Sequence, residues 1–286
     1  MSNVEAENRR RRAAWPAGGR ALLLTLALLA SAPASAQGAA DAAAPRPRID
    51  AAGYPWQAFG RLNRQGSGFC TAVLVGPDLV LTAAHCLHDR RSGRLVAPDR
   101  VHFVAGYQNQ GYAFHALAKR YRIAPGYAPS GTTGTAEQAA RDWAVVELAA
   151  AAPASLGYLG VARLDRAQSL PTAATFGLAG YGRDRPYALS SDDDCRLVAW
   201  EANSPLVLHD CRAVGGTSGA PIVGARGGVW LVYAVHVGQA SIAERDDKLG
   251  VAVPSHVFFE TVRAAAGRPV RHGGNGLDIL PGRRPE

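Results

Sequence analysis

Three residues of this sequence stand in local settings that suit chemistry. His85 ends the run VLTAAH, where an apolar strand leads into a turn of small residues that can present an imidazole at a cleft. Asp142 opens the run DWAVVEL, so its carboxylate stands at the mouth of an otherwise apolar strand. Ser218 lies in GGTSGAP, where the glycine density lets backbone N–H groups crowd one point in space.

Each residue alone has an ordinary structural explanation, but together they form a catalytic set. A serine hydroxyl is a poor nucleophile until an imidazole takes its proton and a carboxylate fixes the tautomer of that imidazole. We therefore expect Ser218 to be the nucleophile, His85 the base and later the acid, and Asp142 the group that orients His85. The N–H groups of Gly216 and Ser218 would form the oxyanion hole. This chemistry needs neither a cofactor nor a metal.

The elements that must position these residues read as short strands. Runs rich in Val, Leu, Ile, Phe and Tyr recur between Gly, Pro, Asn and Asp breakers, which is typical of an all-β barrel or sandwich. In the first half the runs are 57–62, 70–75, 79–82, 100–105 and 143–148. In the second half they are 174–179, 195–200, 221–223, 229–237 and 249–254, so two β lobes of similar size are expected. Ser255 is a plausible N-cap and Gly267 a stop for a helix over 255–266.

The segments GFCTA, LTAAHC, DWAVVEL, GYG and GTSGAP follow one another in the order found in trypsin-like serine peptidases, which the chain resembles over about residues 54–262. The resemblance implies two antiparallel six-stranded β-barrels of the chymotrypsin type with a short C-terminal helix. The barrels would span about 54–155 and 156–254. His85 and Asp142 would come from the first barrel and Ser218 from the second.

The chain departs from the digestive members of that family at Thr217, where they carry an aspartate that pairs with a newly freed N-terminus. Arg48 and Ile49 superficially form an activation site, but no acid at position 217 awaits the new terminus. The chain instead resembles the bacterial branch that includes the glutamyl endopeptidases. We expect activity that does not depend on cleavage after Arg48.

The resemblance places the pocket for the residue before the cut between segments 210–216 and 234–240. Arg212 stands where a preference for Lys or Arg would need an acid, although nearby Asp210 leaves the sign of the pocket open. His236 and Gly238 lie in a segment that resembles the one where glutamyl endopeptidases grip a substrate carboxylate. Arg212, His236 and Gly238 are therefore candidate substrate-binding residues, with a strand histidine as the alternative for His236.

Four regions of the chain differ in composition. Residues 1–36 carry arginines, an apolar run and a small-residue end, which together indicate a signal peptide, and the run is too short for a membrane span. Residues 37–53 read as a leader or short propeptide, 54–267 as the peptidase domain and 268–286 as a flexible tail. The expected location is secreted or periplasmic, with no stable membrane insertion after the signal is removed.

The four cysteines are expected to form disulfides, because an exported chain meets an oxidising compartment. Four cysteines allow three connectivities, and local pairing of Cys70 with Cys86 and of Cys195 with Cys211 is the economical one. Zinc is the competing interpretation, but the sequence has no Cys-x-x-Cys pair. The family resemblance also supports the Cys70–Cys86 bridge.

Composition restricts the partners. The 286 residues are 48% hydrophobic and 19% charged, as in globular proteins. Removing residues 1–36, which hold five Arg and two Glu, lowers the formal charge from +8 to +5. The remaining basic residues are scattered outside the tail, without interleaved aromatic residues, so no nucleic-acid partner is expected. The expected partner is a polypeptide substrate.

Two other function classes remain as alternatives. An α/β-hydrolase esterase also uses Ser, His and an acid, but its nucleophile elbow reads Gly-x-Ser-x-Gly and its triad runs Ser, acid, His. Ala220 breaks that elbow, and the order here is His, Asp, Ser. A catalytically silent trypsin-like fold that serves as a binding module is the other alternative, and labelling of Ser218 by a phosphonylating reagent discriminates it.

Overall fold

The computed structural model of the protein describes residues 45–66, 68–89, 91–129, 135–168, 170–171, 174–241, 248–273 and 276–285. The chain divides into two units, Met1–Ala43 and Ala44–Glu286, and every described residue belongs to the second. The predicted signal peptide and residues 37–44 of the predicted leader therefore lie outside the described residues.

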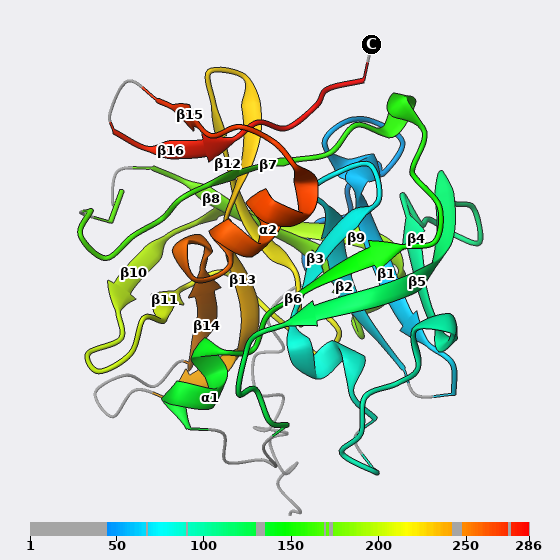
Figure 1. Ribbon diagram of the computed structural model, residues 1–286, viewed down its shortest axis with the longest axis horizontal. Coiled ribbons are helices and arrows are strands. Elements are labelled where there is room, and N and C mark those ends of the chain that lie inside the picture. The colour runs from blue at the N-terminus through cyan, green and yellow to red at the C-terminus, as the bar shows by residue number, and fades with distance from the viewer. Residues whose placement is uncertain are drawn as a thin grey trace, which may run out of the picture. The chain divides into compact units, whose positions relative to one another are not determined.

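The first half of the described chain is a closed antiparallel barrel with the strand order β1-β2-β3-β6-β5-β4 (Figure 1). Its strands are β1 (Phe59–Arg64), β2 (Phe69–Leu74), β3 (Leu79–Thr82), β4 (Val101–Ala105), β5 (Phe114–Ile123) and β6 (Ala144–Leu148). The barrel closes because β1 pairs with both β2 and β4. This half confirms the predicted six-stranded barrel.

The central strands of this barrel follow from continuous apolar sequence. Every residue of β3 and of β6 is buried, and the two strands pair with Val80 opposite Val146. Runs that are buried on both faces show no alternation, because neither face meets water. β3 leads into His85 and β6 follows directly on Asp142 and Trp143, so the buried pair fixes the two residues expected to act together.

The second half is one sheet with the main order β10-β11-β14-β13-β12-β8-β9, to which β7, β16 and β15 are added. Its strands are β7 (Gly160–Ala162), β8 (Phe176–Gly182), β9 (Arg185–Cys195), β10 (Leu197–Trp200), β11 (Val207–His209), β12 (Pro221–Arg226), β13 (Val229–Ser241), β14 (Lys248–Pro254), β15 (Arg271–His272) and β16 (Asp278–Leu280). Only Arg196 separates β9 from β10, so the two ends of the order are consecutive in the chain. Together with the first barrel, this sheet confirms the predicted all-β fold class.

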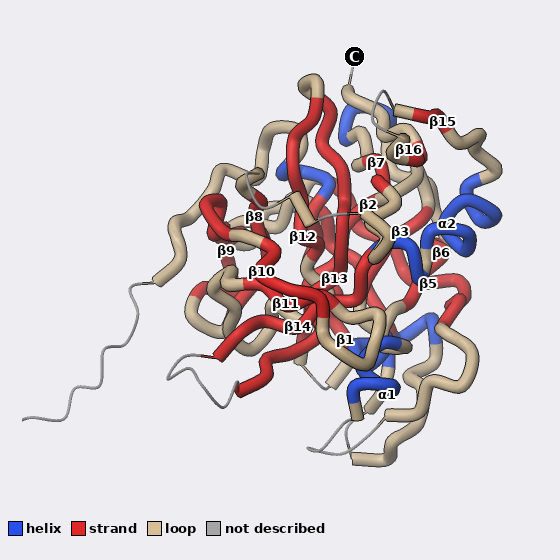
Figure 2. Tube along the Cα trace, turned by 90° about the vertical axis from the view of Figure 1, so that its left-hand side faces the viewer, coloured by secondary structure: helices blue, strands red, loops and turns tan. Residues whose placement is uncertain are grey.

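Helices are few in the described chain (Figure 2). The α-helices are α1 (Ala136–Ala140) and α2 (Phe259–Ala266), and α2 ends at Gly267, whose φ of 60° lies in the left-handed region that favours glycine. Ser255 is not the N-cap of α2. Its hydroxyl instead donates to the Ala162 carbonyl and accepts from the Leu164 N–H at 2.7 Å. Among the described residues, no helix is long and apolar enough to cross a membrane.

The C-terminal segment differs from the predicted flexible tail. β16 pairs with both β7 and β15, and Ile279 lies opposite Ala162. Leu280 is fully buried, and the Arg268 guanidinium donates to the carbonyl oxygens of Val75 and Pro281. The described part of 268–285 therefore adds strands to the sheet. Its buried apolar side chains and backbone pairing could not be inferred from its basic composition.

The end of the predicted leader also packs on the domain. Arg46 is only 2% exposed, and its guanidinium donates to the carbonyl oxygens of Gly180 and Ser190 at 3.4 and 3.5 Å and lies 3.5 Å from Asp184. The N–H of Ile49 donates to the Leu189 carbonyl at 3.0 Å. The ordered domain therefore begins before residue 54, since this segment pairs with β9.

Candidate active site

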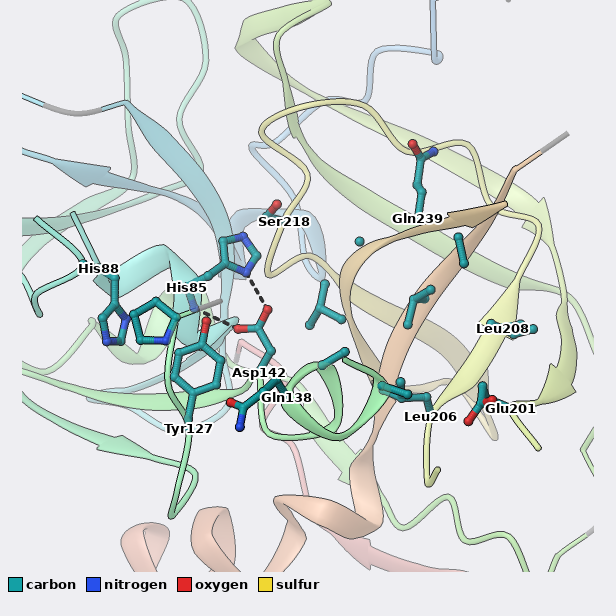
Figure 3. Close-up of a pocket in the computed structure, with 18 of the residues that line it drawn as sticks. His85, His88, Tyr127, Gln138, Asp142, Glu201, Leu206, Leu208, Ser218 and Gln239 are labelled. Atoms are coloured by element: carbon teal, nitrogen blue, oxygen red, sulfur yellow. Dashed lines mark hydrogen bonds and ion pairs between the residues drawn. The ribbon is translucent and has the colours of Figure 1, made fainter. Parts of the chain in front are cut away.

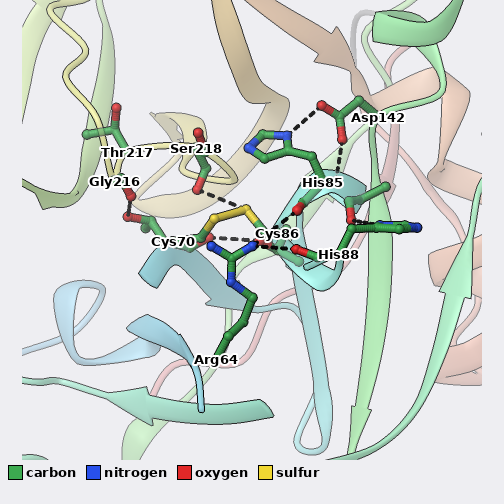
Figure 4. Close-up of a disulfide and its surroundings, with 12 residues drawn as sticks. Arg64, Cys70, His85, Cys86, His88, Asp142, Gly216, Thr217 and Ser218 are labelled. Atoms are coloured by element: carbon green, nitrogen blue, oxygen red, sulfur yellow. Dashed lines mark hydrogen bonds and ion pairs between the residues drawn. A yellow bond between two sulfur atoms is a disulfide. The ribbon is translucent and has the colours of Figure 1, made fainter. Parts of the chain in front are cut away.

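His85 is held where β3 gives way to a short 3₁₀ helix, Ala84–Leu87. The disulfide Cys70–Cys86, with an S–S distance of 2.08 Å, ties this helix to β2. Arg64 supports the same turn, because its guanidinium donates to the His88 carbonyl at 2.8 Å and to the His85 carbonyl at 3.4 Å (Figure 4). The second disulfide joins Cys195 to Cys211 at 2.05 Å, so both pairings are those that the sequence favours.

Asp142 lies beside His85 at the start of β6. Its Oδ2 atom is 2.6 Å from Nδ1 of His85, and its Oδ1 atom accepts from the His85 backbone N–H at 2.8 Å. Two contacts to one residue fix both the position of the backbone and the orientation of the ring. The short Nδ1 contact favours the tautomer in which Nδ1 carries hydrogen and Nε2 is free to accept a proton.

Tyr127 completes the surroundings of Asp142, and sequence reasoning missed it. Burial and the negative charge of the nearby Asp142 carboxylate raise the pKa of the Tyr127 hydroxyl, which therefore stays protonated beside Asp142. Figure 3 shows Tyr127 and His85 close to the same carboxylate. No local motif marks this tyrosine, because it comes from the loop after β5 and meets Asp142 only in the folded barrel.

Ser218 lies in the loop between β11 and β12. Its carbonyl oxygen accepts from the Thr71 N–H at 2.9 Å, which couples the loop to the first barrel. The neighbouring Gly219 has φ +81°, and a Cβ there would lie 2.2 Å from Oγ1 of Thr82 and 2.4 Å from the Thr71 carbonyl oxygen. Glycine is therefore required where this loop passes so close to β2 and β3.

Thr217 explains why the loop needs no charge before the nucleophile. The residue is fully buried, and its hydroxyl donates to the Val214 carbonyl at 2.6 Å and accepts from the Val214 N–H at 3.2 Å. Its own N–H donates to the same carbonyl at 3.0 Å. A threonine thus closes the turn over 214–217 with neutral hydrogen bonds.

The geometry around Gly216 leaves two backbone donors available. Within the described chain, neither the N–H of Gly216 nor that of Ser218 donates to another protein group, whereas the N–H of Thr217 between them is bonded. Gly216 adopts φ +101°, and a Cβ there would lie 2.7 Å from the Phe69 ring. Two free amides that flank a hydroxyl are suited to receive an oxyanion.

The three residues meet in one pocket of about 940 Å³. His85, Asp142 and Ser218 all line it, together with residues of β13 such as Gly238 and Gln239. Figures 3 and 4 place the His85 ring between Asp142 and Ser218. Among the described residues, no hydrogen bond joins the Ser218 hydroxyl to His85, and such contacts are often loose before substrate binds.

The candidate substrate-binding residues are not brought together. Gly238 lines the pocket, but Arg212 does not, and its guanidinium lies 3.5 Å from Asp192. The Arg212 N–H also donates to Asp192 at 2.7 Å. The structure thus pairs Arg212 with a residue of β9, and a role for Arg212 in substrate binding stays a prediction.

His236 is buried at 4% exposure on β13, next to residues 237–240, which line the pocket. Its Nδ1 atom lies 3.0 Å from Nε2 of His209 on β11. Burial lowers the pKa of His209 to about 3 and, with repulsion from His209, His85 and Arg46, holds that of His236 well below its usual value. Both rings are therefore neutral near pH 7, and His209 is a second residue that sequence reasoning missed.

Two groups of potential metal ligands occur among the described residues. One is Cys70, His85 and Cys86, and the other is Cys195, Asp210 and Cys211. In both groups the cysteines are bonded to each other, so neither offers a thiolate. The close spacing of these atoms therefore reflects the disulfides.

Comparison with known proteins agrees with this architecture. The glutamyl endopeptidase of Bacillus licheniformis is 25% identical over 177 residues, which cover 59% of this chain and 49% of that protein. The chain thus spans about half the length of the curated relative it matches. A solved structure described as Glu endopeptidase in complex with MPD has a TM-score of 0.62 at 17% identity, covering 78% of this chain and 97% of that one, which shows a shared fold.

The family is shown by a sequence model that matches most of the described chain. The model named Trypsin matches residues 46–258, well over half of the chain. The match begins at Arg46, the buried residue of the segment that packs on β9, and extends into the C-terminal helical turn. This protein therefore belongs to the trypsin family.

Proposed function

We propose that the protein is a serine endopeptidase in which Ser218 attacks the substrate, His85 transfers protons and Asp142 orients His85. One observation carries the proposal: a single pocket is lined by all three residues, with His85 Nδ1 held 2.6 Å from Asp142. The polypeptide substrate follows from the family and from the length of the pocket along β13. No step of this mechanism calls for a cofactor.

The proposed reaction runs in two halves. The Ser218 hydroxyl loses its proton to His85 Nε2 as Oγ bonds to the scissile carbonyl carbon, and the oxyanion accepts hydrogen bonds from the N–H groups of Gly216 and Ser218. The C–N bond then breaks as His85 returns the proton to the leaving amine, which leaves an ester on Ser218. Water repeats the sequence with His85 as base and releases the acid.

We further propose a preference for Glu or Asp before the cut. With His209 Nε2–H donating to Nδ1 of His236, the hydrogen of neutral His236 resides on Nε2, which makes that atom a donor for a carboxylate. The relative from Bacillus licheniformis is named a glutamyl endopeptidase, which supports the same preference. Gln239 lines the pocket, and its side-chain amide donates to the Ala213 carbonyl at 3.2 Å. This hydrogen bond joins the two segments, 210–216 and 234–240, that are expected to flank the substrate side chain.

Export completes the proposal. Residues 1–36 have the charge, apolar core and small-residue end of a signal peptide, and two disulfides suit an oxidising compartment. We place the mature protein outside the cytoplasm, secreted or periplasmic. Mass measurement of the exported chain tests this, because cleavage after Ala36 predicts an N-terminus at Gln37.

The decisive experiment uses a fluorophosphonate reagent and an internally quenched peptide library on the chain from Gln37. We expect the reagent to add to Ser218 and Ser218→Ala to lose about 10⁴- to 10⁶-fold in turnover while its melting temperature is unchanged. Ser204→Ala, at a serine that does not line the pocket, is the matched control. If the reagent labels Ser218 but no peptide is hydrolysed, the result would favour a different acyl-transfer reaction, such as that of an esterase. If Ser218 is not labelled and no peptide is hydrolysed, the result would favour a catalytically silent binding module.

A further inference from the structure

A second pocket, of about 610 Å³, is also lined by Ser218. It is lined by Gly215 and Gly216, whereas the first pocket is lined by Gly238 and Gln239 of β13. A peptide whose carbonyl carbon lies at Ser218 must extend in both directions. If its acyl side follows β13, the residues after the cut enter the second pocket.

Three arginines line this second pocket, Arg64, Arg91 and Arg183. Arg183 lies close to the nucleophile loop. Its side-chain Cδ atom would be 3.1 Å from a Cβ at Gly215, and its backbone N–H donates to the Gly215 carbonyl at 2.7 Å. Arg64 is held near the disulfide by its bonds to the His85 and His88 carbonyls (Figure 4). Positive charge therefore comes from three separate segments of the fold.

One carboxylate, that of Asp89, opposes these charges in the pocket lining. Its Oδ1 atom already accepts from the N–H groups of Arg91 and Ser92 at 2.9 and 2.8 Å and from the Ser92 hydroxyl at 3.1 Å. Among the described residues, the side chains of Arg91 and Arg183 form no ion pair. The pocket thus carries an excess of positive charge and donors, and Phe69 adds an apolar wall for the methylene groups of a side chain.

We propose that this pocket is a specificity subsite for acidic residues, Asp or Glu, at the first two positions after the cut, with Arg183 and Arg91 as its ligands. The inference rests on the proposed endopeptidase function and adds to it the leaving-group side of the substrate. Both arginines are exposed, so each contact would contribute modestly and would weaken as salt screens it. The full preference arises because both cations act on one carboxylate.

The test measures kcat/KM on quenched peptides that share one acyl side and differ only in Asp against Asn, or Glu against Gln, at the two positions after the cut. We expect the acidic peptide to be preferred about two- to fivefold for each arginine engaged, with the ratio falling as NaCl rises. Arg183→Gln and Arg91→Gln should each reduce the ratio, and the double variant should bring it close to one. Arg122→Gln, on the exposed outer surface of β5, is the control and should leave the ratio unchanged.

Acyl transfer isolates the same pocket from the acyl side. Once a peptide ester has acylated Ser218, an added dipeptide amide competes with water: its amino nitrogen bonds to the acyl carbon, the ester bond breaks, and its proton returns through His85 to Ser218 Oγ. Asp-Gly-amide should capture more acyl group than Asn-Gly-amide. The ratio of the two yields should be smaller in Arg183→Gln than in the wild-type enzyme. Equal capture and equal kcat/KM with an active enzyme would overturn the subsite but not the peptidase, whereas an enzyme with no turnover and no label at Ser218 would overturn the peptidase itself.

Discussion

The Nε2 atom of His209 lies 3.0 Å from the Nδ1 atom of His236, with the two rings nearly perpendicular at 77°. His209 is fully buried, and its Nδ1 atom has no hydrogen-bond partner among the described residues. The least costly arrangement has His209 donate through Nε2, since a bare Nδ1 acceptor is easier to leave unpaired than a buried N–H. A hydrogen bond between two buried imidazoles thus links β11 to β13 in the second sheet.

This pair predicts that the protein loses stability in mild acid. Burial lowers the pKa of His209 from 6.5 to about 3, so the folded state binds fewer protons than the unfolded state between those values. The contribution of such a histidine to the free energy of unfolding is therefore fully present above about pH 6.5. It is lost as the pH drops toward 3, by up to about 1.4 kcal/mol per pH unit. Urea unfolding from pH 8 to pH 4 measures the slope.

A variant assigns that slope to the pair. His209→Gln removes the titrating group and should flatten the dependence of the free energy of unfolding on pH, whatever its stability at pH 8. His272→Gln, in the exposed hairpin of β15 and β16, is the control. An unchanged slope in His209→Gln would show that other groups govern the acid response.

The acidic preference before the cut makes a separate prediction at His236. His236→Asn removes the proposed donor but keeps a polar side chain next to His209, so kcat/KM after Glu should fall far more than kcat/KM after Leu. Loss of one partner of a largely buried pair of this kind costs roughly 2–5 kcal/mol. Peptides that differ only at the residue before the cut provide the measurement, and a uniform loss on both would instead indicate a structural histidine.

The segment before Ile49 predicts activity without processing at that point. Thr217 closes its turn with neutral hydrogen bonds, and Arg46 holds the preceding segment on β8 and β9. Arg48→Gln in the chain from Gln37 should block trypsin-type cleavage yet keep near wild-type turnover of peptides. Arg46→Ala should lower the free energy of unfolding by about 1–3 kcal/mol, because it leaves buried carbonyls unpaired. Inactivity of intact Arg48→Gln, checked by mass, would require a released terminus.

The two disulfides predict similar stability effects but different effects on activity. Both close loops with a sequence separation of 16, so removing either pair should cost about 3 kcal/mol. The Cys70–Cys86 bridge lies beside His85 and Thr71, whereas Cys195–Cys211 joins the end of β9 to the loop after β11. Replacing the first pair by Ala should therefore reduce kcat in the folded fraction, and replacing the second should leave it largely intact. Denaturant curves with peptide assays below the transition separate the two effects.

The chemistry and the fold class were within reach of the sequence because their signals are local. Runs such as those of β3 and β6 are apolar throughout, and the residues adjoining His85, Asp142 and Ser218 are small or glycine where the backbone must turn. Local pairing of cysteines is also a short-range choice. A hydrophobic period or a turn residue carries this information in a few consecutive positions.

Other elements were missed because their neighbours come from distant parts of the chain. β5 and β9 carry Lys, Arg and Asp along exposed faces, so their patterns do not read as strands. The pairing of Arg212 with Asp192 and of β16 with β7 was not predicted, because these contacts join segments 20 or more residues apart. Only the tertiary structure buries Arg46 and brings His209 to His236, since the environment of a charged or titratable group depends on which strands surround it.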